Sequence, residues 1–139
     1  MTSRREVLAW TAVTLAVGAA FIAAQFEVVA GTIRLHLGMI GTRIYEVRSR
    51  TGRWPAAVDD LEGTPYTQVR DWRELVNNGV YVVRWHQDLK PTPEDNSDRI
   101  LAYDGASRLR FAGIMVLRGD LRIERMEAAR LRAALAEDR

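Results

Sequence analysis

The pattern of apolar and charged positions divides the chain into an N-terminal stretch without charge and a remainder in which apolar and charged residues are mixed. No charged residue interrupts the sequence from Val7 to Phe26. A helix needs ~20 apolar residues to cross a hydrocarbon core about 30 Å thick, and this stretch has about that length. The pattern therefore predicts a membrane-spanning or export segment over residues 1–26 and a single folded domain over residues 27–139.

The large apolar side chains of the first stretch are expected to face lipid. They are Val7, Leu8, Trp10, Val13, Leu15, Val17, Phe21, Ile22 and Phe26. Small residues lie among them, namely Gly18, Ala19, Ala20, Ala23 and Ala24. Because small residues let helix backbones approach closely in a membrane, we expect this second set to mediate self-association or contact with another membrane protein.

Two arginines precede the apolar stretch, and they are compatible with both an uncleaved anchor and a cleaved export signal. Arg4 and Arg5 favour an uncleaved anchor with the N-terminus on the cytoplasmic side and an exported C-terminal domain. Together with Ser3 they also resemble a twin-arginine export signal. Cleavage would then follow small residues, for which 22–24 and 28–30 are candidates. We favour the single-pass anchor in a bacterial cytoplasmic membrane. The alternatives are a cleaved signal that delivers a periplasmic binding domain, and a helix buried in a soluble protein.

Helical periodicity continues beyond the apolar stretch and predicts one helix that extends over residues 27–50. Apolar residues recur at spacings of three and four and share one face of this helix: Ile33, Leu37, Ile40, Ile44 and Val47. Arg34, Arg43 and Arg48 lie between them. We expect the apolar face to pack on a small sheet while the arginines face water. The other possibility is a basic amphipathic helix that lies on anionic lipid headgroups.

The remainder of the chain predicts short helices, then strands, then a last helix. We expect short helices over 55–63 and 71–77, strands over 80–85, 99–103, 114–117 and 121–124, and a helix over 127–137 with a stripe of Ala128, Leu131, Ala134 and Leu135. The uninterrupted apolar run 114–117 is typical of an inner strand. The fold class is therefore α+β, with a long N-terminal spine helix packed on a small antiparallel sheet and helices on one face of that sheet.

Composition excludes several kinds of chemistry. The chain has 20 basic and 18 acidic residues, a balance too even to indicate nucleic-acid binding. It has no cysteine, which excludes disulfides and thiolate metal sites. His36 and His86 lie in different elements, without the spacing of metal ligands. The acidic loop 94–98 lacks the calcium-binding spacing of an EF-hand, so we expect a solvated loop. We expect no enzyme activity, no cofactor, no metal and no identifiable small-molecule ligand.

Three stretches resemble type IV pilin-like or pseudopilin-like proteins. The first is the apolar run with its amphipathic extension, 7–50, and the second is the segment from Tyr45 through Gly52-Arg53-Trp54-Pro55 to Leu61. The third, 100–123, is similar to the C-terminal hairpin of pilin-like proteins of planctomycete-type bacteria, which often reads His, nine residues, Asp-Gly. Arg110 stands at the position of that His and Leu121 at that of the Gly. The start of the apolar run also lacks a Gly-Phe-Thr-Leu-x-Glu cleavage motif.

The resemblance implies a membrane helix that continues into the domain as its spine and packs on a small antiparallel sheet. It also implies a structural or assembly role in a secretion-type or pilus-type system, or another interaction in the cell envelope. The partners implied are the lipid bilayer, further copies of the chain and other pilin-like or secretion proteins.

Overall fold

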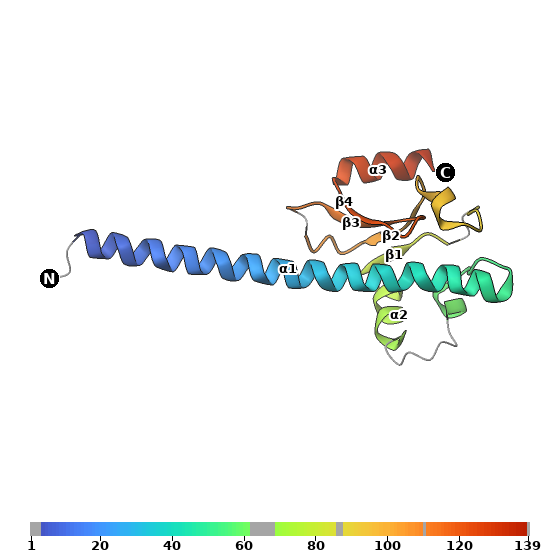
Figure 1. Cartoon of the computed structure of the whole chain (residues 1–139), viewed down its shortest axis with the longest axis horizontal. Helices are drawn as coiled ribbons and strands as arrows, with labels where there is room; N and C mark the ends of the chain where they lie inside the picture. Colours follow the sequence, from blue (N-terminus) through green and yellow to red (C-terminus); the bar gives the residue numbers. More distant parts are fainter. Residues whose placement is uncertain (1–3, 62–68, 86–87, 110, 139) are drawn as a thin grey trace. The chain divides into compact units, whose positions relative to one another are not determined.

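The computed structural model describes residues 4–61, 69–85, 88–109 and 111–138, and side chains within these ranges except those of 4–5 and 69–72. The described helices are α1 (Arg4–Thr51), α2 (Val69–Asn77) and α3 (Ala128–Glu137), with 3-10 helices η1 (Val58–Leu61) and η2 (Pro93–Asn96). The strands are β1 (Tyr81–Val83), β2 (Ile100–Asp104), β3 (Ile114–Arg118) and β4 (Ile123–Met126) (Figure 1). The α+β class is confirmed.

Helix α1 is a single helix of 48 residues, as the periodicity predicts. It ends at Thr51, where Gly52 takes a left-handed conformation with φ of +72° and donates a hydrogen bond to the Arg48 carbonyl at 2.9 Å. Glycine adopts this conformation without the steric penalty of a Cβ atom, which makes it a common helix terminator. The chain falls into two compact units, one up to Thr32 and one from Ile33 onward, so that α1 belongs to both.

The second unit contains a four-stranded antiparallel sheet in the order β1-β2-β3-β4. Strand β3 is an inner strand, as its apolar sequence predicts, and Met115, Val116 and Leu117 are all buried. In the register of the sheet, Leu117 lies opposite Ala102 on one side and Ile123 on the other. Because side chains alternate along a strand, Leu117 and Val116 point to opposite faces, and both faces must be covered.

The first face of the sheet is packed against α1. All five residues of the predicted apolar stripe are buried: Ile33, Leu37, Ile40, Ile44 and Val47. A Cβ atom on Gly41 would lie 2.8 Å from Leu121 and 3.0 Å from Leu117, so the helix approaches the β3–β4 hairpin closely at this residue. The expectation that every arginine of this helix faces water is wrong at Arg43. It is 7% exposed and forms an ion pair with Glu46, which offsets the cost of burying the guanidinium.

The second face of the sheet is packed against α3, so the expectation that all helices share one face is wrong. Ile100, Val116, Met126 and Leu131 form a buried cluster, with Tyr103, Ile114, Ala134 and Leu135 packed around it. Figure 1 shows α3 and the domain's part of α1 on opposite sides of the strands. Of the predicted stripe of α3, Ala128 is exposed and does not join the cluster. The cause lies in β3, whose apolar residues on both faces require two layers of cover.

The segment after α1 differs from the helix expected at Pro55. Only Val58–Leu61 is helical, as the 3-10 turn η1. The Asp60 carboxylate accepts hydrogen bonds from the Ala56 and Ala57 N–H groups at 2.6 and 3.1 Å, which satisfies the donors at the start of the turn. Trp54 lies outside the turn, and its indole Nε1 donates to the Leu89 carbonyl at 3.1 Å. The predicted stop at Gly63 lies outside the described residues.

The remaining elements agree with prediction in kind and differ in length. Helix α2 ends at Asn77 as expected, and Gly79 after it has φ of +72°. Strand β1 ends at Val83, so that Trp85 lies beyond the strand and is half-buried. In the hairpin, Leu121 belongs to the turn, with φ of +67°, rather than to the strand. Its side chain nevertheless lies close to α1, since a Cβ atom on Gly41 would lie 2.8 Å from it.

The acidic loop is not uniformly solvated. It contains the 3-10 turn η2, in which Asn96 is 2% exposed. The Asn96 Oδ1 accepts from the Lys90 N–H at 2.8 Å, and Nδ2 donates to the carbonyls of Lys90 and Thr92 at 2.8 and 3.0 Å. These bonds use the amide to hold the loop together. The prediction of a solvated loop is therefore wrong at Asn96, because a buried amide must find partners inside the protein.

Candidate membrane anchor and an arginine-lined groove

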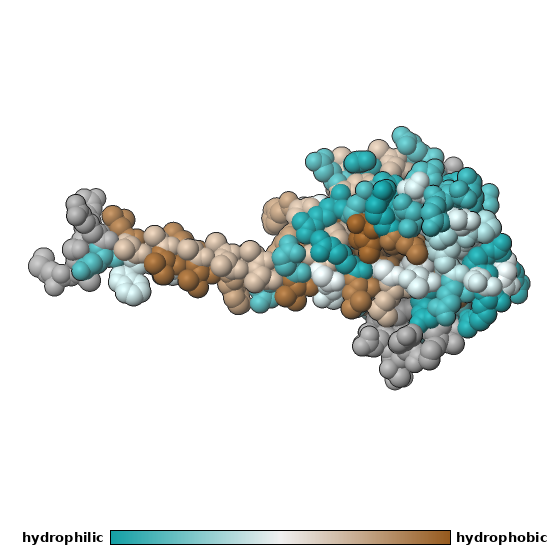
Figure 2. All heavy atoms as spheres, viewed as in Figure 1, coloured by the Kyte–Doolittle hydropathy of each residue, from teal (hydrophilic) through white to brown (hydrophobic). Residues whose placement is uncertain are grey.

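Most of the large apolar side chains in the N-terminal part of α1 are exposed. Eight of the nine predicted anchor residues are exposed by 53% to 70%: Val7, Leu8, Trp10, Val13, Leu15, Val17, Phe21 and Ile22. Phe26 is half-buried. Figure 2 shows apolar residues along this part of α1 and hydrophilic residues over most of the visible face of the folded domain.

The exposed apolar surface of this part of α1 is too large to be left in water without a substantial cost in free energy. Burial of one large apolar side chain is worth ~1.5–3 kcal/mol. Eight such side chains left in water would forgo on the order of 10–20 kcal/mol, as much as the whole stability of a typical domain. Within the described chain one helix, Glu6–Thr51, is long and apolar enough to cross a membrane, with a mean hydropathy of 2.1 in an 18-residue window of which 0% is buried.

Two threonine hydroxyls inside the apolar stretch are satisfied by the helix itself. The Thr11 hydroxyl donates to the Val7 carbonyl at 2.8 Å, and the Thr14 hydroxyl donates to the Trp10 carbonyl at 2.9 Å. Such bonds remove the need for a partner in solvent. In hydrocarbon every polar group must be satisfied internally, so both threonines are compatible with a spanning helix.

The small residues form exposed ridges on the same helix. Ala19 and Ala23 are four residues apart, as are Ala20 and Ala24, so each pair lies on one ridge of the helix. All of them, with Gly18, are exposed. A Cβ atom on Gly18 would meet nothing within 4 Å, so no contact in the described chain requires glycine there.

The predicted export motif is described only in part. Arg4 and Arg5 begin helix α1, and their side chains lie outside the described atoms. Ser3 lies outside the described residues. The twin-arginine interpretation therefore stays a prediction.

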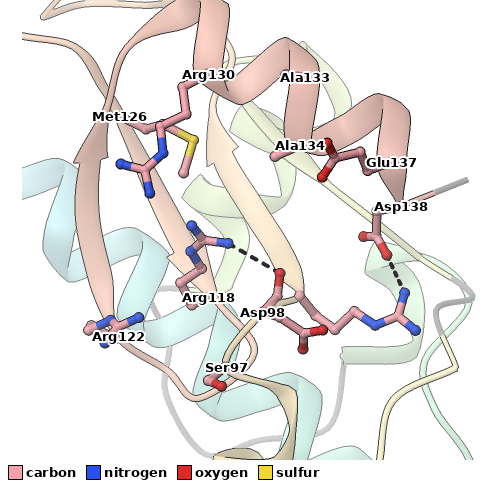
Figure 3. A pocket seen from close by; sticks show the side chains of 11 residues that line it. Ser97, Asp98, Arg118, Arg122, Met126, Arg130, Ala133, Ala134, Glu137 and Asp138 are labelled. Atoms are coloured by element: carbon pink, nitrogen blue, oxygen red, sulfur yellow. Dashed lines mark hydrogen bonds and ion pairs between the residues drawn. The ribbon is translucent and has the colours of Figure 1, made fainter.

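The folded domain also contains a groove on the α3 side of the sheet, of about 660 Å³. Four arginines and three acidic residues contribute to its lining, together with small and apolar residues: Ser97, Asp98, Arg99, Arg118, Arg122, Met126, Arg130, Ala133, Ala134, Glu137 and Asp138 (Figure 3). No pattern in the sequence indicates this groove, because its lining comes from three separate segments, 97–99, 118–126 and 130–138. Ala133 and Ala134 leave space on the helix side because their side chains are short.

Several of the charged side chains in this groove form ion pairs within the protein. The Arg118 guanidinium bonds Glu124 at 2.7 Å through Nε and the Asp98 carbonyl at 3.2 Å through Nη1. Asp138 forms ion pairs with both Arg84 and Arg99, which connects the end of α3 to the sheet. Guanidinium forks bind carboxylates and phosphates well, yet here the protein supplies the carboxylates itself. The groove therefore contributes to the attachment of α3.

A second polar cluster joins α1 to β1. The His36 Nδ1 and the Tyr81 hydroxyl are 2.9 Å apart, and the two rings meet edge to face. Burial raises the pKa of the Tyr81 hydroxyl above its ordinary value of 10.0. His36 thus packs within the helix–sheet contact, whereas His86 lies outside the described residues. The described residues contain no group of three or more His, Asp or Glu that could hold a metal ion.

The described fold has a long N-terminal apolar helix packed on a small antiparallel sheet, which is compatible with a pilin-like fold. No protein-family model, curated protein or solved structure matches this chain.

Proposed function

We propose that this chain is a non-enzymatic, single-pass membrane protein of pilin-like architecture. The N-terminal part of α1 is the anchor, with its N-terminus in the cytoplasm. The α+β domain lies on the exported side of the cytoplasmic membrane, where it serves a structural or assembly role in a secretion-type, pilus-type or other envelope system.

One observation carries the proposal: the environment of a single helix changes along its length. Up to Ile22 the large apolar residues of α1 are exposed, and from Ile33 the apolar stripe of the same helix is the core of a folded domain. A soluble core helix would be buried along both parts. A helix whose apolar surface is split in this way suits one part in lipid and one part in a domain.

Membrane extraction tests the anchor and separates it from the alternative of a cleaved export signal. An uncleaved anchor predicts that the protein stays in the membrane after carbonate washing and keeps its original N-terminus. The cleaved form predicts a soluble periplasmic pool whose N-terminus follows residue 24 or 30. Sequencing the N-terminus of protein from both fractions decides between them.

A charge placed in the middle of the apolar stretch provides a second test. Val17→Arg puts an arginine near the centre of the proposed span, where its cost is ~2.5–3.5 kcal/mol. The ratio of inserted to non-inserted protein should fall on the order of 100-fold. Gln25→Arg is the matched control, because an arginine near the end of a span reaches the interface and costs little. Equal insertion of the two variants would contradict the proposed span.

Topology and assembly need separate measurements. Because the chain has no cysteine, Ser97→Cys provides a unique thiol in the folded domain. A membrane-impermeant maleimide should label it in spheroplasts if the domain is exported, and protection there would contradict the orientation. For assembly, Ala20→Cys should give disulfide-linked dimers or adducts in membranes, with Leu15→Cys as the comparison on a large side chain. A protein that is monomeric and without adducts would count against an assembly role.

A further inference from the structure

Three of the four arginines in the groove beside α3 come together from separate elements. Arg118 ends β3, Arg122 directly precedes β4, and Arg130 lies in α3. In Figure 3 the Arg118 and Arg130 side chains point toward one another. The carboxyl groups of Glu137 and Asp138 lie across the groove from them. The positive charge of the groove is therefore concentrated on the side of these three arginines.

The β3–β4 hairpin itself brings Arg118 and Arg122 together. The Arg118 N–H donates to the Arg122 carbonyl at 2.8 Å, so the two residues lie opposite each other at the base of the hairpin. Opposite residues of an antiparallel pair project their side chains to the same face of the sheet, with Cβ atoms about 5 Å apart. That face is the one covered by α3, because Val116 and Met126 alternate with the same period and belong to the α3 cluster. Like charges in this arrangement repel each other.

Ion pairs within the protein compensate these charges unequally. Arg118 pairs with Glu124 at 2.7 Å. The Arg122 side chain is 60% exposed and reaches Asp120 only at 3.9 Å. The Arg130 guanidinium has no ion pair or hydrogen bond with any residue that the structure describes. Two of the three guanidinium groups therefore keep most of their N–H donors for a ligand.

We propose that Arg118, Arg122 and Arg130 bind a phosphate group, carried either by a soluble phosphate ester or by a lipid headgroup. One guanidinium fork can satisfy a planar carboxylate, whereas a tetrahedral phosphate presents oxygens to several guanidinium groups at once. A phosphate monoester carries a charge of about −1.5 to −2 at neutral pH, which matches the two arginines without a close partner. The proposal concerns the folded domain alone and does not depend on the membrane anchor.

The groove has room for more than the phosphate. Its volume of about 660 Å³ lies within the range of about 300–1,000 Å³ that is typical of small-molecule sites. Ala133 and Ala134 follow Arg130 by three and four residues and therefore continue the same face of α3. Their short side chains leave space beside the arginines. Glu137 follows by seven residues, roughly 10 Å along the helix, where its carboxylate can accept hydrogen bonds from hydroxyl groups of an ester.

Calorimetric titration of the full-length protein in maltoside micelles tests the proposal. The two phosphate ligands are glycerol phosphate, a soluble monoester, and glycerophosphoglycerol, the headgroup of phosphatidylglycerol without its acyl chains. Sodium acetate at equal ionic strength is the comparison, because a cationic surface attracts any anion to an extent set by the salt concentration.

Three variants assign the binding to the groove. Arg130→Ala and Arg122→Ala each remove one guanidinium at an exposed position, so we expect the domain to stay folded. Arg132→Ala is the matched control, because Arg132 is exposed on the same helix and is not one of the groove-lining residues. Arg118 is left unchanged because its pair with Glu124 gives it a structural role.

The expected result is saturable binding of a phosphate ligand and none of acetate. Arg130→Ala and Arg122→Ala should each weaken the binding on the order of 10-fold, the worth of a hydrogen bond between charged groups. Arg132→Ala should change it by less than about twofold, since an exposed charge outside the site contributes little. Tighter binding of glycerol phosphate assigns a soluble ester as the ligand, and tighter binding of glycerophosphoglycerol assigns a lipid headgroup.

The proposal is overturned by any of three results. No saturable binding of either phosphate ligand excludes the site. Equal binding of acetate shows that the groove attracts anions without selecting phosphate. An equal loss in Arg132→Ala and Arg130→Ala assigns the binding to the general charge of α3.

A second measurement needs no variant. The better phosphate ligand should raise the thermal unfolding midpoint of the unmodified protein more than sodium acetate does at equal ionic strength, because a ligand that binds only the folded state stabilises it. Equal midpoints in the two solutions would contradict the phosphate site.

Discussion

The side-chain amide of Asn96 donates a hydrogen bond to the hydroxyl of Tyr45 at 2.9 Å. This bond joins the turn η2 to the C-terminal part of α1, more than forty residues away in the sequence. The Tyr45 hydroxyl donates to the Gly119 carbonyl at 2.6 Å, so the helix, the turn and the β3–β4 hairpin meet at one oxygen atom. The position of the spine helix on the sheet therefore depends on a polar contact as well as on the apolar stripe.

Asn96→Ala should lower the stability of the domain by about 2–4 kcal/mol, since it removes a buried amide and its hydrogen bonds to the backbone of Lys90 and Thr92 and to the Tyr45 hydroxyl. Urea unfolding of the full-length protein in detergent, followed by tryptophan fluorescence, measures the change. Ser97→Ala is the control, because Ser97 is exposed and follows directly in the sequence. Equal midpoints for the two variants would show that the Asn96 contacts are replaced by water at no cost.

Two glycines of α1 should respond in opposite directions to the same substitution. Alanine is favoured over glycine in a helix by about 1 kcal/mol. At Gly38 the new methyl would lie 3.8 Å from Ile123, an ordinary contact, so Gly38→Ala should stabilise the domain. At Gly41 the methyl would lie 2.8 Å from Leu121 and 3.0 Å from Leu117, and overpacking costs about 1–3 kcal/mol. Gly41→Ala should therefore be less stable than Gly38→Ala in thermal unfolding. A Gly41→Ala variant as stable as Gly38→Ala would mean that the two leucines move freely.

Alkaline pH should destabilise the domain through two tyrosines. Burial raises the pKa of Tyr45 and of Tyr81 above their ordinary value of 10.0. Above about pH 10 the unfolded chain loses these protons while the folded chain keeps them, so stability is complete below this pH and falls as pH rises through the folded-state pKa.

Unfolding midpoints measured from about pH 8 to about pH 11 test this dependence. The slope between pH 10 and 11 should become smaller in Tyr45→Phe and in Tyr81→Phe, whatever their stability at neutral pH. An unchanged slope in both variants would assign the alkaline transition to other groups.

Asp138→Asn should loosen α3 from the sheet, because this carboxylate pairs with Arg84 and Arg99 at once. We expect a loss of about 1–2 kcal/mol at low salt, since both arginines are partly exposed and solvent weakens the pairs. Hydrogen exchange of the α3 amides should be faster in the variant, and the difference should shrink in 1 M salt, where screening acts over about 3 Å. Glu137→Gln, one residue before, is the matched control. Equal exchange in the two variants would contradict a role for the ion pairs.

Local patterns in the sequence were sufficient for the parts of the fold that depend on neighbours in the chain. The five apolar residues from Ile33 to Val47 are buried as their spacing predicts, because a 3.6-residue period places them on one face whatever the partner. The end of α1 near residue 50 and the inner position of β3 also follow from local patterns. The exposed large apolar residues up to Ile22 also agree with a stretch that contains no charge from Val7 to Phe26.

The sequence-based predictions are wrong where the environment of a residue is formed by segments distant in the sequence. The sequence predicts Arg43 in water, yet it is buried beside the helix–sheet contact and forms an ion pair with the exposed Glu46. Asn96 was assigned to a solvated loop, yet Tyr45 and the backbone of its own loop enclose it. The groove beside α3 combines residues from three separate segments, and no spacing in the sequence indicates it.

The sequence by itself determined the helical spine, its apolar run, the α+β class and the inner strand, because these follow from the period of apolar residues along one segment. The tertiary structure alone decided that α3 and the part of α1 from Ile33 onward lie on opposite faces of the sheet (Figure 1), that Gly41 must be small, and that Phe111 is fully exposed. Burial and contact arise only when distant segments fold together. Two residues more than forty positions apart, such as Tyr45 and Asn96, can touch without any regular spacing of residues in the sequence that would predict the contact.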